Sequence, residues 1–366
     1  MDEFRDPESV RRLLGRIQER ADRQMRFMEF CGGHTHAIFK FGIRSLLPAQ
    51  VKMLSGPGCP VCVTSARDMD RAMALAGVDG LILATFGDMM RVPGSRGSLQ
   101  DAKAQGADVR IVYGCLDALA LARAHPGREV VFLAVGFETT APTVAASVLE
   151  ARVQGIGNFS VLSLHKLTPP AVEAILRAGE VELDGILGPG HVTTIIGARA
   201  WEFLPARHRI PCAVAGFEPT DILRGILALV EMAASDRPAV CNAYTRSVRP
   251  DGNPEARRLM EQVFEVVEAD WRGLGRLPSS GFSLREEFSS FDAARRHPVE
   301  APTDGIEPPG CRCGDVLRGV LEPPQCPLFG KRCTPEAPVG PCMVSGEGSC
   351  AAYLQYAACC ASKTET

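Results

Sequence analysis

Short apolar runs alternate with amphipathic stretches along most of the chain up to about residue 240. The apolar runs predict strands, at residues 51–54, 80–85, 109–112, 129–135, 160–164, 185–187 and 211–215. Between them, apolar residues recur every three or four positions and predict helices, at residues 65–76, 115–124, 141–154, 169–178 and 193–200. Strands that alternate with helices form β-α-β units, so we predict an α/β protein with parallel sheets. Ligands of such sheets bind beyond the carboxyl ends of the strands.

The two ends of the chain follow other patterns. Residues 8–29 predict an amphipathic helix, because apolar residues recur at helical spacing among charged ones, at Val10, Leu13, Leu14 and Ile17. Residues 254–271 also have a helical pattern, and a region rich in proline and glycine follows. The tail from residue 311 onward contains many cysteines and few continuous apolar runs. We therefore expect a bound metal to hold this tail together.

Two motifs occur twice, each after a predicted strand. GPGC at residues 56–59 recurs as GPGH at 188–191, and GFETT at 136–140 recurs as GFEPT at 216–220. We therefore expect two similar parallel-sheet α/β domains that flank a cleft. The expected divisions are a first domain of residues 31–125 and 211–240, a second of 126–210, a C-terminal domain of 241–366, and a helix within residues 1–30 that packs on the C-terminal domain.

The repeated motifs allow two interpretations. Their glycines and prolines can simply turn the chain, while threonine caps a helix. Alternatively, Glu138, His191 and Glu218 line the cleft as ligand contacts, because strand ends place them at the rim of the sheets.

Composition narrows the class of protein. The 366 residues are 46% hydrophobic and 23% charged, with a formal net charge of -3 and interleaved acidic and basic residues, so we expect no nucleic-acid partner. We find no apolar core of a signal peptide and no apolar run that could span a bilayer, and we expect a cytoplasmic protein without a membrane partner. The cytosol keeps ordinary thiols reduced, so the 14 cysteines predict metal ligation or redox chemistry instead of a disulfide framework.

The candidate site lies between residues 31 and 62, where CGGHTH and GPGCPVC form two glycine-rich loops. Cys59 and Cys62 form a Cys-x-x-Cys motif at the start of a predicted helix, which can close a small disulfide ring or bind a soft metal. The alternative is that they are buried structural cysteines. Single histidines such as His34 and His36 are more often structural than metal-bound.

The cysteine-rich tail is compatible with two kinds of metal site. Structural zinc favours cysteine pairs two to four residues apart, whereas a Cys-x12-Cys-x6-Cys-x16-Cys spacing fits an iron–sulfur cluster better, at Cys313, Cys326, Cys333 and Cys350. Two further cysteines, Cys311 and Cys342, leave the fourth cluster ligand open. We treat the adjacent Cys359 and Cys360 as bystanders.

Several long motifs together resemble the HypD family of [NiFe]-hydrogenase maturation proteins over nearly the whole chain. They are CGGHTH, GPGCPVC, TFGDMMRVPG, GFETTAPT, GPGHV, GFEPTDIL and the GPCMVS-x-EG-x-C tail. The resemblance implies a scaffold on which Fe(CN)2CO, an iron with two cyanides and one carbon monoxide, is assembled for the hydrogenase. The implied partners are a HypC-type chaperone, whose N-terminal cysteine shares the iron, and the HypE/HypF pair, which donates cyanide.

The same resemblance implies roles for individual residues. Cys31 would bind the iron with His34 beside it, and Cys59 and Cys62 would be the redox-active pair. The [4Fe–4S] cluster would be held in the C-terminal domain by Cys313, Cys326, Cys333 and Cys350. Soft iron prefers thiolate ligands, and the glycines beside Cys31 would let a partner's cysteine approach. Beyond the resemblance, we hypothesise that electrons pass from the cluster through the Cys59–Cys62 pair to the iron.

Two rival functions stay open at this stage. A general thiol–disulfide oxidoreductase would use Cys59 and Cys62 with the cluster as electron donor, and would require no role for Cys31 or His34. A zinc-stabilised interaction module would use the tail cysteines without iron.

Overall fold

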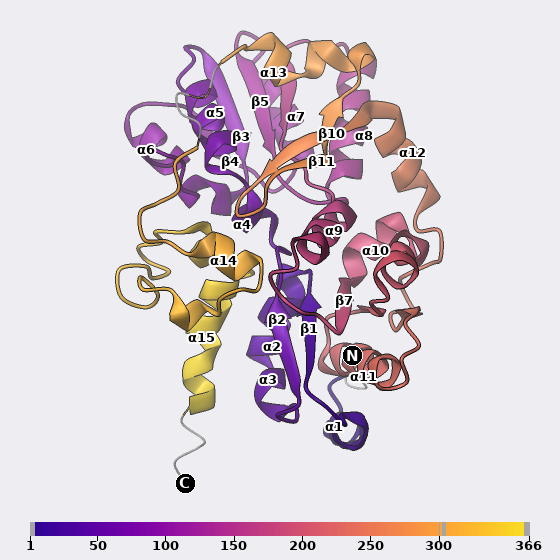
Figure 1. Cartoon of the computed structure of the whole chain (residues 1–366). Coiled ribbons are helices and arrows are strands. Elements are labelled where there is room, and N and C mark those ends of the chain that lie inside the picture. The colour runs from indigo at the N-terminus through magenta and orange to yellow at the C-terminus, as the bar shows by residue number, and fades with distance from the viewer. Residues whose placement is uncertain (1–3, 300, 302–304, 362–366) are drawn as a thin grey trace.

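Two parallel sheets organise the chain in the computed structural model (Figure 1). The structure describes residues 4–299, 301 and 305–361, and the last five of these are described without their side chains. Cys359 and Cys360 therefore lie outside the described side chains. The five-stranded sheet has the order β2-β1-β7-β8-β9, with strands β1 (Met25–Glu29), β2 (Val51–Ser55), β7 (Gly185–Pro189), β8 (Cys212–Ala215) and β9 (Val240–Asn242). The four-stranded sheet has the order β4-β3-β5-β6, with strands β3 (Leu81–Thr85), β4 (Val109–Ile111), β5 (Glu129–Ala134) and β6 (Phe159–Ser163). An antiparallel hairpin pairs β10 (Phe264–Trp271) with β11 (Gly275–Leu284).

Helices connect the strands and cover the sheets. In chain order they are α1 (Pro7–Arg20), α2 (Gly32–Lys40), α3 (Ile43–Leu46), α4 (Pro60–Val63), α5 (Ala66–Ala76), α6 (Leu99–Ala104), α7 (Cys115–Ala124), α8 (Ala141–Val153), α9 (Thr168–Ala178), α10 (Gly190–Ile196), α11 (Pro219–Ala234), α12 (Pro254–Val263), α13 (Ala293–Arg296), α14 (Cys313–Leu317) and α15 (Ser349–Ala361). None of the helices within the described residues combines the length and the apolar character that a membrane crossing requires.

Both faces of the four-stranded sheet are buried, which explains why its strands are continuous apolar runs. Alternate residues of β3 point to opposite faces, so that Ile82 packs with α7 and α8 while Leu83 packs with α5 and α6. The predicted α/β class with parallel sheets is thus confirmed. The predicted strands are all present within two residues of their expected bounds.

The first predicted helix was too long. α1 starts at its Asp6 cap, whose carboxylate accepts from the Ser9 N–H at 2.8 Å, and it ends at Arg20. The next residues form β1, a strand that lies between β2 and β7. Its Met, Arg, Phe and Glu residues include no β-branched side chain, so only its partners in the sheet make it a strand.

The expected domain boundaries do not follow the sheets. The four-stranded sheet uses residues 81–163, and the five-stranded sheet takes its strands from residues 25–55 and 185–242. The chain therefore crosses between sheets after β2 and after β6, and strand hydrophobicity alone does not reveal which sheet a strand joins. α1 also packs on α11, through Leu13 and Ile17, and not on the C-terminal region as expected.

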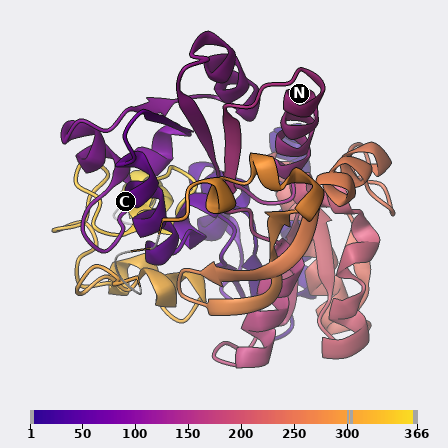
Figure 2. The ribbon, with the colours of Figure 1, turned by 90° about the horizontal axis from the view of Figure 1, so that it is seen from above.

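The expected C-terminal region is divided as well. The predicted helix at 254–271 ends at Val263, and β10 follows without a loop. α12 and the β10–β11 hairpin pack on the core of the four-stranded sheet, through Met260, Phe264 and Leu284. The cysteine-rich tail lies on the other side of the molecule from α12 (Figure 2).

The tail is fixed to both sheets by specific contacts. The Arg91 guanidinium donates to the carbonyl oxygens of Pro335 and Val344, at 2.9 Å each. α15 packs against α2, where the rings of Phe39 and Tyr353 have centroids 5.2 Å apart.

Candidate functional site

The site forms where three neighbouring strands end. β1 is central between β2 and β7, and the strands are parallel, so their carboxyl ends meet at one edge of the sheet. Cys31 follows β1, Cys59 follows β2 in the GPGC loop, and His191 follows β7 in the GPGH loop. The two related loops therefore flank Cys31, one on each side.

The Cys31 loop and the GPGC loop are in close contact. The Gly32 N–H donates to the Gly58 carbonyl at 2.8 Å. A Cβ atom at Gly58 would overlap the backbone nitrogen and Cα of Cys31, so only glycine fits there. This contact places the Cys-x-x-Cys motif directly beside Cys31.

His191 lies against the Cys31 thiol. Its Nδ1 is 3.5 Å from the Cys31 Sγ, while the Phe217 ring packs against the imidazole with centroids 5.2 Å apart. Burial lowers the pKa of His191 to about 4. The ring is therefore neutral near pH 7 and can share a hydrogen bond with the thiol.

The environment of Cys31 keeps its thiol protonated. Burial raises its pKa well above the usual value, the nearby carboxyls of Glu29 and Glu347 raise it further, and hydrogen bonds from the N–H groups of Gly33 and His34 oppose this only in part. Such a thiol is a weak nucleophile, yet a soft metal can displace its proton on binding.

Glu29 positions the loop that carries Cys31. Its carboxylate accepts from the Cys31 N–H at 2.9 Å and from the Thr35 hydroxyl. Burial raises the pKa of Glu29 to about 8, although these hydrogen bonds lower it. The sequence patterns do not single out Glu29, and the available signal is its lone carboxyl within the largely apolar segment MRFMEF.

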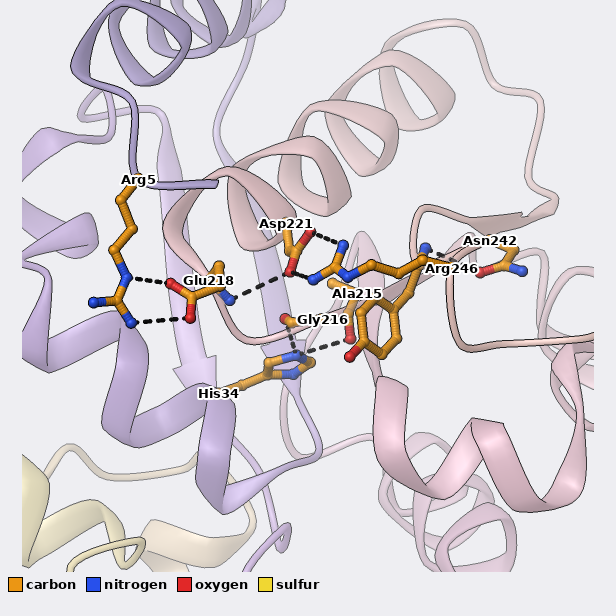
Figure 3. Close-up of polar contacts among 9 residues, drawn as sticks. Arg5, His34, Ala215, Gly216, Glu218, Asp221, Asn242 and Arg246 are labelled. Atoms are coloured by element: carbon orange, nitrogen blue, oxygen red, sulfur yellow. Dashed lines mark hydrogen bonds and ion pairs between the residues drawn. The ribbon is translucent and has the colours of Figure 1, made fainter. Parts of the chain in front are cut away.

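The His34 ring is hydrogen-bonded to the loop after β8. Its Nε2 lies 2.9 Å from the Gly216 carbonyl and 3.2 Å from the Ala215 carbonyl, and Figure 3 shows the ring directed at this loop. Since Nε2 must be the donor, Nδ1 carries the lone pair, and it is buried without a hydrogen-bond partner among the described residues. Burial lowers the pKa of His34 to about 4.

Cys59 and Cys62 are buried, free thiols at the two ends of the first turn of α4. The Cys59 Sγ accepts from the Cys62 N–H at 3.3 Å. Burial alone would raise the pKa of Cys62, but the neighbouring thiols of Cys342 and Cys59 and the nearby guanidinium of Arg272 lower it to about 5. Burial and the neighbouring Cys62 raise the pKa of Cys59. The surroundings therefore favour ionisation of Cys62 over that of Cys59.

The four tail cysteines proposed as cluster ligands lie around one cavity. Six thiols line it, and its other lining residues are apolar side chains and a glycine; the thiols belong to Cys311, Cys313, Cys326, Cys333, Cys342 and Cys350. Among the described residues, no three His, Cys, Asp or Glu side chains are arranged to hold a single metal ion. Thiolates that each bind a different iron surround a volume instead of meeting at one point, so this soft, apolar donor set fits an iron–sulfur cluster.

The polar residues of the repeated motifs make different contacts. Glu138 is buried and accepts from the Thr168 N–H and hydroxyl at 2.8 Å each, so it caps the start of α9. Glu218 pairs with Arg5 at 2.5 Å, at the edge of the network in Figure 3. Of the three, His191 is the residue in contact with Cys31.

Comparisons with known proteins cover nearly the whole chain. A family model described as HypD, hydrogenase formation hypA family, matches residues 8–357. The chain is 49% identical over 365 residues to the hydrogenase maturation factor HypD of Azotobacter vinelandii, which covers 97% of this chain and 96% of the relative. It is 45% identical over 364 residues to the factor of the same name from Escherichia coli K12, with 97% of both chains covered.

A third relative, the hydrogenase maturation factor HypD of Cupriavidus necator, is 46% identical over 367 residues, with 97% of this chain and 96% of the relative covered. Identity at this level over nearly complete chains, together with the family model, confirms the resemblance seen in the motifs. The chain therefore belongs to the HypD family of hydrogenase maturation factors.

Proposed function

We propose that this protein is the scaffold on which the Fe(CN)2CO group of a [NiFe]-hydrogenase is assembled, in the cytoplasm. The observation that carries the proposal is the meeting of Cys31, Cys59 and His191 at adjacent strand ends. The iron is cargo, and Cys31 is its thiolate ligand on this chain. Family membership supports a role in hydrogenase maturation.

The neutral His191 ring suits the arrival of such cargo. When iron binds Cys31, the thiol proton must leave, and the imidazole nitrogen 3.5 Å from Sγ can accept it. His34 acts on the other side, where its hydrogen bond to Gly216 fixes the first turn of α2. We propose His34 as a positioning residue for Cys31.

The partners follow from the cargo. A HypC-type chaperone would share the iron through its own cysteine, and a HypE/HypF pair would supply cyanide. Because Cys31 is buried, the partner has to enter between the loops after β1, β2 and β7. The space beside Gly32 is filled by Glu347 of the tail, and the space beside Gly33 is filled by the Phe217 ring.

Cys59 and Cys62 would serve as the redox pair next to the cargo. A [4Fe–4S] cluster held by Cys313, Cys326, Cys333 and Cys350 would supply electron-transfer chemistry when bound. Arg272 holds negative charge at Cys62, since its guanidinium is buried and lies near that thiol.

Infrared spectroscopy on protein purified without oxygen, alone and with its chaperone, tests the proposal. We expect bands of metal-bound cyanide and carbonyl in the wild type that vanish in Cys31→Ala, with iron and sulfide retained in both. Cys59→Ser should also retain iron and sulfide but fail to load ligands onto the iron. Iron and sulfide without such bands, in protein co-expressed with the full maturation set, would favour a general thiol–disulfide oxidoreductase. Zinc in place of iron would favour an interaction module.

A further inference from the structure

Tyr244 lies at the same edge of the five-stranded sheet as the candidate site. In the strand order β1-β7-β8-β9, Cys31 follows β1, His191 follows β7, Phe217 follows β8 and Tyr244 follows β9. These strands are parallel, so their carboxyl ends bring the four residues to one edge. The fold therefore places the Tyr244 ring beside the loop that carries His191.

The Tyr244 ring lies between the loops after β7 and β8. A Cβ atom at Gly190 would come within 2.7 Å of one edge of the ring, and a Cβ atom at Gly216 would come within 2.5 Å of the opposite edge. Gly190 directly precedes His191, and Gly216 directly precedes Phe217. The ring thus leaves no room for a side chain at either glycine, and it sets the spacing of the two loops.

Phe217 extends this support to the imidazole itself. The rings of Tyr244 and Phe217 meet edge to face with centroids 6.3 Å apart, and the Phe217 ring packs on His191 with centroids 5.2 Å apart. His191 in turn lies against the Cys31 thiol. Tyr244 thus supports His191 in two ways, through the backbone before it and through the Phe217 ring.

Polar and charged contacts fix Tyr244 in its place. Its N–H donates to the Asn242 side chain at 3.0 Å, and the Arg246 guanidinium lies 4.4 Å from the centre of its ring. The same guanidinium donates to the fully buried carboxylate of Asp221 at 2.7 Å (Figure 3). Because this ion pair holds the cation that covers the ring, Tyr244 is a rigid support.

We propose that Tyr244 is a positioning residue of the site, whose ring keeps His191 beside the Cys31 thiol. The loops that the ring separates are rich in glycine, and their backbones would move into the space that a missing ring leaves. His191 would then lose its fixed position, and solvent would reach the thiol more often. The inference rests on the proposed function only in treating Cys31 as the functional thiol.

The reactivity of Cys31 tests the inference. The full chain is produced without its maturation partners, purified without oxygen, treated with iodoacetamide and examined by mass spectrometry over time. Tyr244→Ala should raise the alkylation rate of Cys31 by about tenfold, which corresponds to about 1.4 kcal/mol in the opening of the site. Tyr244→Phe keeps the ring and should retain the wild-type rate. Tyr244→Leu fills part of the space and should raise the rate less, and it serves as the test variant if Tyr244→Ala does not fold.

A double variant separates positioning from other effects of the ring. If Tyr244 acts through His191, adding Tyr244→Ala to His191→Ala should change the alkylation rate of Cys31 no further. Effects that multiply in the double variant would overturn the proposal, because Tyr244 would then act by another route.

Phe282→Ala is the matched control, because it removes a partly buried ring from β11, on the core of the four-stranded sheet, and its Cys31 rate should equal that of the wild type. Cys115 reports on general loosening, since its thiol is buried in α7. An equal rise at Cys31 and Cys115 in Tyr244→Ala would overturn the proposal, and so would a Tyr244→Phe rate as high as that of Tyr244→Ala. The assay needs neither cargo nor chaperone, so missing infrared bands would contradict the scaffold function without affecting this result.

Discussion

At the scale of single residues, similar motifs perform different tasks according to what surrounds them. Glu138 and Glu218 both follow a Gly-Phe pair, but one caps α9 inside the protein and the other pairs with Arg5 at the surface. His191 occupies the position that corresponds to Cys59 in the related loop, and it contacts Cys31. The motif predicts that the residue lies at the sheet edge. The side chains and backbone groups around that residue determine which contacts it makes.

Glu29 should make stability depend on pH. Its pKa is raised to about 8, above its ordinary value of 4.5, so the stability it contributes is complete below pH 4.5 and is lost as pH rises toward 8. Glu29→Gln does not titrate there, and its free energy of unfolding should fall less than that of the wild type across this range. The difference should reach a few kcal/mol, since one pKa unit corresponds to about 1.4 kcal/mol.

Urea unfolding of the reduced protein at several pH values measures this effect. Glu138→Gln is the control, because burial raises the pKa of Glu138 only to about 7. This substitution should flatten the plot of unfolding free energy against pH below pH 7. It should leave the plot above pH 7 unchanged. Parallel curves for Glu29→Gln and wild type would show that Glu29 is ionised in the folded protein.

At the scale of elements, the site depends on the close contact between the Cys31 loop and the GPGC loop. Gly58→Ala should destabilise the protein by about 3 kcal/mol and displace Cys31, because the added Cβ overlaps the Cys31 backbone. The same substitution at Gly77, which ends α5 with a negative φ of -81° and 3.5 Å to the nearest atom, should change little. Urea unfolding and infrared spectra of both variants test this, and equal behaviour of the two would contradict it.

The capping role of Glu138 is also testable. Glu138→Ala leaves the Thr168 N–H at the start of α9 without its acceptor, and we expect it to lower the free energy of unfolding by roughly 2 kcal/mol. The infrared bands per folded molecule should match the wild type. Loss of these bands at wild-type stability would instead assign Glu138 to the chemistry.

Local patterns predicted the strands buried on both faces well, because continuous apolar runs such as Leu81–Thr85 admit few alternatives. They failed at β1 and β10, where amphipathic sequences continue a helical pattern and only partner strands decide the outcome. Cys31, Cys59 and Cys62 could be singled out from residue chemistry. Their meeting with His191 could not, since it depends on the strand order β2-β1-β7 in the folded sheet.

At the scale of the whole molecule, the sheets and the tail are stabilised by different means. The cores of the four-stranded sheet and of the α1–α11 side of the five-stranded sheet contain none of the tail cysteines. The tail has six thiols around a cavity, with anchoring contacts such as those from Arg91. Its order should therefore depend on the metal, while that of the four-stranded sheet should not.

Cys333→Ser should lose iron and sulfide and show faster hydrogen exchange in residues 311–350. The strands of the four-stranded sheet should keep their protection, because the core between this sheet and the helices α7 and α8 contains no tail residue. Cys115→Ser, which alters a buried thiol of α7 outside the tail, should retain iron, sulfide and tail protection. Unchanged exchange in the Cys333→Ser tail would show that the tail folds without metal.

Through α2, the position of Cys31 depends on the folded tail. The helix begins directly after Cys31. One face packs in the core with α1 and α11, through Ala37 and Ile38. Another face contacts the tail, where His36 lies 3.3 Å from the Gly346 carbonyl and 3.4 Å from the Tyr356 hydroxyl. A chain whose tail has not yet folded lacks the surface that steadies this helix, so its Cys31 would not be held in place. Faster exchange at residues 32–40 in Cys333→Ser would reveal this dependence. The protein would then be unable to accept cargo before its own tail has folded.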